Sequence, residues 1–161
     1  MTMLIESLEQ VATVTHEPTA ADKIQRILYR LDHGIELTYS RMKRGDNFCV
    51  LGLFAEESGL GYWNGHDCYV VNGEPNSGSL HTSISEYYGL ASETGIFRIQ
   101  DLPKHIVHDL NQKMAHQLGG VLSSISVVND EFLIKGYKPN QILADIIRSG
   151  AIFLEKTGEV F

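Results

Sequence analysis

The fold is decided by Phe48-Cys49-Val50-Leu51-Gly52-Leu53-Phe54-Ala55, the most continuously apolar run of the chain. A run of this length cannot span a bilayer, because a membrane helix needs about 20 apolar residues. It therefore predicts a helical segment that is buried on all sides, with the other elements packed around it. We expect Asp46 or Asn47 to cap its first turn and Gly59 to supply the left-handed residue that ends it.

Composition and charge restrict the class of protein. The chain has 161 residues, of which 43% are hydrophobic and 20% charged, as expected for one soluble globular domain. Its start, Met1 to Glu6, lacks the basic residues and apolar core of a signal peptide, so we expect a cytoplasmic protein without a membrane partner. The formal net charge of −7 disfavours binding to a nucleic-acid backbone.

Helical patterns outnumber strand patterns along the chain. The clearest one is an apolar stripe between Thr19, a predicted N-cap, and His33-Gly34, where the helix is expected to stop. The stripe consists of Ile24, Ile27, Leu28 and Leu31. Further helices are expected over residues 81–88, 102–118 and 139–150.

The strand signals are short and suggest hairpins. Segments 68–71 and 96–99 favour strands. Segment 61–65 favours a turn, and segment 74–79 favours a mobile polar loop. The sequence therefore predicts an α+β fold, a single compact domain with several helices packed on a small antiparallel sheet. We expect residues 1–18 to form a loosely attached N-terminal segment and residues 19–161 to form the domain.

Cys49 is the candidate nucleophile of the chain. A thiol in the first turn of a helix feels the positive end of the helix dipole, which lowers its pKa, and papain-like hydrolases use this arrangement. His66 and His81 are the histidines that would serve as its base. The alternative, which we favour, is that Cys49 packs as a small buried hydrophobe, because Phe48 and Val50 flank it.

No cofactor or metal site is predicted. The chain contains neither the G-x-x-x-x-G-K-[ST] phosphate loop nor the G-x-G-x-x-G fingerprint. Cys49 and Cys68, its two cysteines, lack the paired spacing of a zinc site and are expected to be reduced thiols. His105 and His108 share a helix face but lack a third ligand, so they favour a solvated face. Asn129 and Asp130 are expected at a turn before the last helix.

Aromatic residues beside glycine-rich loops are the candidate binding residues. These are Tyr62, Trp63, Tyr69, Tyr87 and Tyr88. Amphipathic aromatics of this kind suit a binding surface, including a pocket that stacks on a ring, but they equally suit the rim of an ordinary core.

Several stretches of the chain are similar to sequence motifs that occur together in one protein family. Residues 46–56 are similar to its Y-C-C-L-G-V-L-C-D motif, and Tyr87-Tyr88-Gly89-Leu90 is similar to its W-L-G-L segment. Val127-Val128-Asn129-Asp130 with residues 137–147 resembles an L-N-D motif followed by a helix, and Ile27-Leu28-Tyr29-Arg30 resembles the opening A-L-R-S-G. The motifs together resemble those of a family of small, uncharacterised proteins from tailed phages and prophages, and the resemblance covers residues 24 to 150.

The resemblance implies a phage or prophage source and residence in the host cytoplasm. It implies no reaction and no catalytic residues, and Val50 and Ala55 stand where the family motif has cysteines, which argues against a shared cysteine-based metal site. The favoured hypothesis is a non-enzymatic accessory protein that binds and modulates a host protein or sequesters a small molecule. The alternatives are a cysteine-dependent hydrolase or transferase and a homo-oligomeric assembly protein.

Overall fold

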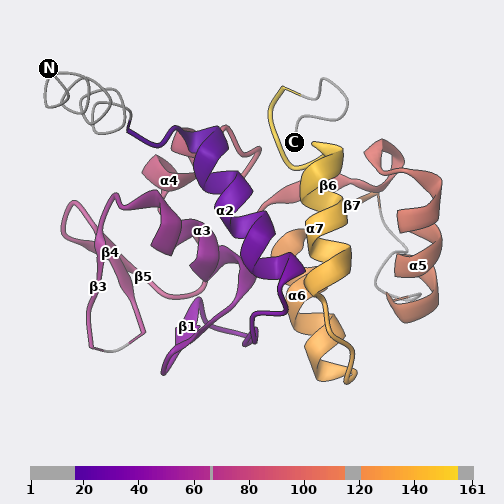
Figure 1. Ribbon diagram of the computed structural model, residues 1–161, viewed down its shortest axis with the longest axis horizontal. Helices are drawn as coiled ribbons and strands as arrows, with labels where there is room; N and C mark the ends of the chain where they lie inside the picture. The colour runs from indigo at the N-terminus through magenta and orange to yellow at the C-terminus, as the bar shows by residue number, and fades with distance from the viewer. Residues whose placement is uncertain (1–16, 66, 115–120, 156–161) are drawn as a thin grey trace, which may run out of the picture.

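The computed structural model describes residues 17–65, 67–114 and 121–155. In these residues six α-helices are accompanied by three small antiparallel sheets, which confirms the predicted α+β class (Figure 1). The helices are α2 (Ala20–Asp32), α3 (Val50–Ser58), α4 (Thr82–Tyr88), α5 (Lys104–Met114), α6 (Ile125–Ile134) and α7 (Asn140–Ser149). The N-terminal segment predicted over residues 1–18 lies mostly outside the described residues.

The strands are short and fall into three sheets instead of one. The pairs are β1 (Lys43–Arg44) with β2 (Asn47–Phe48) and β6 (Ile96–Arg98) with β7 (Leu122–Ser124), and the three-stranded sheet has the order β3 (Tyr62–Trp63), β4 (Tyr69–Val71), β5 (Glu74–Asn76). The three-stranded sheet lies at one end of the molecule beside α3, and α5 lies at the other (Figure 1).

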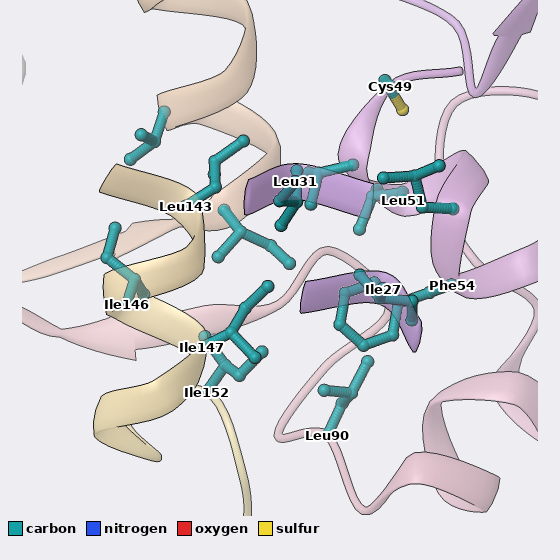
Figure 2. Close-up of a cluster of buried hydrophobic side chains, with 14 of the residues drawn as sticks. Ile27, Leu31, Cys49, Leu51, Phe54, Leu90, Leu143, Ile146, Ile147 and Ile152 are labelled. Carbon is teal, nitrogen blue, oxygen red and sulfur yellow. The ribbon is translucent and has the colours of Figure 1, made fainter. Parts of the chain in front are cut away.

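Helix α2 forms as its sequence predicts. Thr19 Oγ1 accepts a hydrogen bond from the Asp22 backbone N–H, and the Asp22 carboxylate accepts one from the Thr19 N–H, which together make a capping box. The apolar stripe is buried between α3 and α7. Figure 2 shows Ile27 and Leu31 of α2 between side chains of these two helices.

Helix α3 contains the apolar run and is the most deeply buried element. Its side chains from Val50 to Ala55 are buried, and Gly59, with φ of 66°, ends it as predicted. The predicted cap is wrong, because Asn47 belongs to β2 and Asp46 to the turn before it. Cys49 is the N-cap residue, and its side chain accepts no capping hydrogen bond.

Two segments assigned to a turn and a loop are strands. Residues 62–63 of the predicted turn and 74–76 of the predicted loop pair with β4 on either side. Strand β5 forms because the chain makes a tight hairpin turn at Asn72 and Gly73, whose φ values are 50° and 79°. This turn brings β5 back along β4. Strands of two or three residues have no periodicity that a sequence pattern can reveal.

The segment before the last helix also differs from its prediction. Asn129 and Asp130 lie inside α6 and not at a turn. The helix starts early because Ser124 Oγ, at the end of β7, accepts a hydrogen bond of 3.1 Å from the Val127 N–H. The helix predicted over residues 139–150 is observed as α7, which ends at Gly150 in the left-handed conformation.

Candidate functional site

Cys49 lies at the edge of the buried cluster in Figure 2, immediately before α3. Its exposed fraction is 6%, and this burial raises the pKa of the thiol to about 11. Backbone N–H groups of the first turn, at Leu51 and Gly52, act in the opposite direction, but the desolvation of the thiolate is the larger effect. The thiol is therefore protonated near neutral pH, which agrees with the favoured interpretation of Cys49 as a small buried hydrophobe and gives no support to the alternative, a nucleophile.

The candidate base His81 is engaged in holding a helix. Its Nδ1 accepts a hydrogen bond of 3.0 Å from the Ser83 N–H, and it is the N-cap residue of α4. The proton of the neutral ring is therefore assigned to Nε2, which lies 3.4 Å from Oε2 of Glu74. These contacts join His81 to α4 and β5 and not to Cys49. The other candidate, His66, lies outside the described residues.

The predicted aromatic residues do not gather into one pocket. Tyr69 and Tyr88 are core residues, with exposed fractions of 3% and 5%. Their hydroxyl groups form hydrogen bonds with backbone groups. Tyr69 Oη accepts a hydrogen bond from the Gly61 N–H at 3.0 Å, and Tyr88 Oη donates one to the Phe54 carbonyl at 2.8 Å. Burial raises the pKa of the Tyr88 phenol above its usual range, so this phenol remains a hydrogen-bond donor.

Trp63 belongs to a cluster that is already occupied by the protein's own groups. Its ring centroid lies 4.8 Å from that of Tyr69 and 5.6 Å from that of Phe48. Lys43 Nζ lies 5.2 Å from the Trp63 centroid, and the indole Nε1–H donates to the Glu56 carboxylate. These contacts join the β1–β2 hairpin to β3 and α3, so the half-buried indole primarily stabilises the fold.

Tyr62 faces the opposite side of the sheet and is 62% exposed. The register places it beside Val70, and Val70 beside Pro75, so one apolar side chain from each strand forms a row. We call these three residues the outer row. Val70 is buried but lies outside the main hydrophobic core. The outer row therefore presents two exposed side chains, Tyr62 and Pro75, with the buried Val70 between them.

Asn129, expected at a turn, instead has a structural role that its sequence context does not predict. It is fully buried in α6, and its Oδ1 accepts a hydrogen bond of 3.0 Å from the Val50 N–H, the first donor of α3. Its Nδ2 donates to the Thr38 carbonyl at 2.8 Å and to Asp130 Oδ1 at 3.0 Å. Asn129 therefore caps α3 from another helix. No local pattern signals this role, because the capped residue is 79 positions away.

Two of the family-like stretches bond to α3, most of which lies in a third. Asn129 bonds the start of this helix, and Tyr88 bonds the carbonyl of Phe54 in its middle. The motifs that carry the resemblance thus have a packing role in this chain, and none of these contacts forms a catalytic arrangement.

A hollow of about 560 Å³ lies between the start of α5 and the end of α7. Leu102 and Ile106 form apolar parts of its wall, and polar residues complete it. Arg148 on this wall also forms an ion pair with Asp32 of α2, with Nη1 3.2 Å from Oδ1. The volume is in the range of small-molecule sites. The lining residues are Asp101, Leu102, Pro103, His105, Ile106, Asp145, Arg148 and Ser149.

A second hollow, of about 320 Å³, is lined by Arg41, Arg44 and Asp67. The sequence shows its arginines as part of a small basic cluster but does not show that Asp67 closes the space beside them.

The described residues hold no group of three or more His, Cys, Asp or Glu side chains arranged to bind a metal ion. Within the same residues, no helix is long and apolar enough to cross a membrane. No protein family, curated protein or solved structure that was compared with the chain matches it.

Proposed function

We propose that the chain is a non-enzymatic accessory protein that binds a protein partner through the outer row. The observation that carries the proposal is Tyr62, which is 62% exposed and stands with the exposed Pro75 on the outer sheet face, on either side of the buried Val70. The family resemblance extends the proposal to a phage protein that modulates a host factor.

The chemistry of the outer row suits an anchor for a protein. Tyrosine is enriched among the residues that dominate binding energy, because it combines a large apolar ring with a polar tip and few rotatable bonds. Strand β3 pairs only with β4 among the described residues, so its other edge offers backbone groups beside Tyr62. Pro75 on β5 lacks an N–H, which makes that edge the poorer template for an added strand.

The alternatives have less support. The buried, protonated thiol of Cys49 and the capping role of His81 do not provide a nucleophile and base. Sequestration of a small molecule is supported by the hollow between α5 and α7, which has a suitable volume. The outer row suits a protein partner better than a small molecule, because its exposed side chains stand on a sheet face and not in a recess.

A matched pair of tyrosine variants tests the proposal. Tyr62→Ala is expected to lower partner affinity about thirtyfold or more, because removal of a central aromatic anchor typically costs about 2 kcal/mol or more. Tyr29→Ala is the control, because Tyr29 has the same exposed fraction of 62% but stacks on His33 on α2. The measurement is quantitative capture of host proteins from lysate, followed by titration of the captured partner against each variant.

The two variants separate the possible outcomes. Equal affinity of Tyr62→Ala and the wild type for the captured partner would refute the outer row as the binding surface. A wild type that self-associates, with Tyr62→Ala monomeric in sedimentation velocity, would replace the host partner with a second copy of the chain.

A further inference from the structure

We propose that the hollow lined by Arg41, Arg44 and Asp67 is an anion site that takes a phosphate or carboxylate group. We call it the arginine hollow. It has a volume of about 320 Å³ and brings two guanidinium groups and one carboxylate together on a chain of formal net charge −7. The inference goes beyond the proposed function, because it concerns residues outside the outer row and needs no protein partner.

Neutral groups orient the guanidinium of Arg44. Its Nη2 donates to Ser40 Oγ at 2.8 Å, and its Cζ lies 5.5 Å from the centroid of the Tyr39 ring. A hydroxyl and an aromatic face position the planar fork without cancelling its charge. The exposed Arg44 therefore has the orientation and charge that an anion site requires.

The guanidinium of Arg41 is held loosely. Its Nη1 lies 3.6 Å from Asp67 Oδ2, which is longer than a hydrogen bond, and its side chain is 55% exposed. An exposed ion pair of this length contributes little. The Asp67 carboxylate is therefore a weak internal competitor, and an incoming anion can form the shorter, charge-assisted bonds that Asp67 does not make.

The backbone between the two arginines is fixed. Met42 is 1% exposed, its N–H donates to the Ser77 carbonyl at 2.7 Å, and its carbonyl accepts from the Cys49 N–H at 3.0 Å. Because Arg41 and Arg44 flank this anchored residue, their Cα positions are set before any ligand arrives. Such preorganisation lowers the entropic cost of binding.

Two residues beside the arginine hollow have an uncommon backbone conformation. Ser40 and Asp67 both have φ of 66°, in the left-handed region that side chains other than glycine rarely adopt. In the described part of the chain the remaining such residue is Asn72, whose conformation belongs to the β4–β5 turn. The fold thus maintains two less favourable conformations beside the arginine hollow, as functional sites often do.

The guanidinium pair defines the ligand class. Two planar forks match the oxygens of a phosphate or a carboxylate, whereas a cation would meet an excess of positive charge in the arginine hollow. The ligand is therefore a molecule or chain segment with an exposed phosphoryl or carboxylate group.

Titration of the full chain with inorganic phosphate, and separately with acetate, at constant ionic strength tests the inference. Binding is followed by NMR at the arginine Nε–Hε groups. Arg44→Gln is expected to weaken phosphate binding about tenfold, because a charge-assisted hydrogen bond is lost. Asp67→Asn is expected to strengthen it about threefold, because the competing charge is removed. Arg98→Gln, at an exposed position of β6, is the matched control and should bind as the wild type does.

The direction of the Asp67 effect makes the test specific. Equal binding by Arg44→Gln and Arg98→Gln, or weaker binding by Asp67→Asn, would overturn the inference. Tighter binding of phosphate than of acetate would assign a phosphoryl group, and tighter binding of acetate would assign a carboxylate. Thermal unfolding of each variant is expected to match that of the wild type, because Arg44 and Arg98 are exposed and the partly exposed Asp67 makes only a long ion pair, and this measurement confirms that the fold is intact.

Discussion

Gly52→Ala is expected to destabilise the protein by about 3 kcal/mol or more, as overpacking against backbone does. A Cβ at this position would lie 1.9 Å from the Met42 carbonyl oxygen and 2.9 Å from its carbon. These are backbone atoms, so α3 or the segment at Met42 must move. The predicted loss is opposite in sign to the gain of about 1 kcal/mol that Gly→Ala usually brings inside a helix. Urea denaturation of the wild type and the variant measures this change in the free energy of unfolding.

Gly78→Ala is the control for this substitution. A Cβ at Gly78 would meet no atom within 4 Å, and its backbone does not have positive φ. The control is therefore expected to change the free energy of unfolding by less than about 0.5 kcal/mol. An equally small change for Gly52→Ala would show that Met42 does not pack against α3 as described.

Asn129→Leu is expected to lower the free energy of unfolding by about 3 kcal/mol. The substitution leaves the buried N–H of Val50 and the carbonyl of Thr38 without their side-chain partner, and each unsatisfied buried group costs about 1–3 kcal/mol. Faster hydrogen exchange at the Val50 amide, relative to amides in the middle of α3, would locate the loss at the helix start.

The exposed Asn111 provides the control for Asn129. Asn111→Leu, on the exposed face of α5, removes an amide of the same size without affecting a buried partner. Equal stability of the two leucine variants would contradict the role of Asn129 as a remote cap.

The sequence predicts the elements whose signals are local. The helix α2 is predicted in full because its cap at Thr19 and its stripe of buried residues lie within one segment. Gly59 ends α3 as expected, and Gly89 and Gly150 end α4 and α7 in the same left-handed conformation, which is a local requirement. Local chemistry thus accounts for most helices and for the α+β class.

The sequence-based predictions fail where contacts between residues far apart in the sequence determine the local structure. The cap of α3 comes from Asn129 and not from Asp46 or Asn47, and no sequence pattern links positions so far apart. Tyr69 and Tyr88 were candidate binding residues, but tertiary packing buries both. At Cys49 the sequence left an activated thiol and a buried hydrophobe open and favoured the second; the packed structure buries the residue, and the cost of desolvating the thiolate exceeds the dipole effect.

The candidate surfaces were only partly visible in the sequence. Tyr62 could be named as a binding residue, but its place beside Val70 and Pro75 depends on strands too short to predict. The arginine hollow depends on the approach of Asp67 to Arg41, which joins two separate loops.

The central claim is that α3 is a scaffold and that function resides on the surface around it. Timed alkylation of the native protein near neutral pH, with each cysteine followed by mass spectrometry, tests this claim most directly. Cys68, which is partly exposed, should be labelled first, and Cys49 only as fast as the protein unfolds. Labelling of Cys49 in the folded protein at or above the rate of Cys68 would contradict the account and restore Cys49 as a candidate nucleophile.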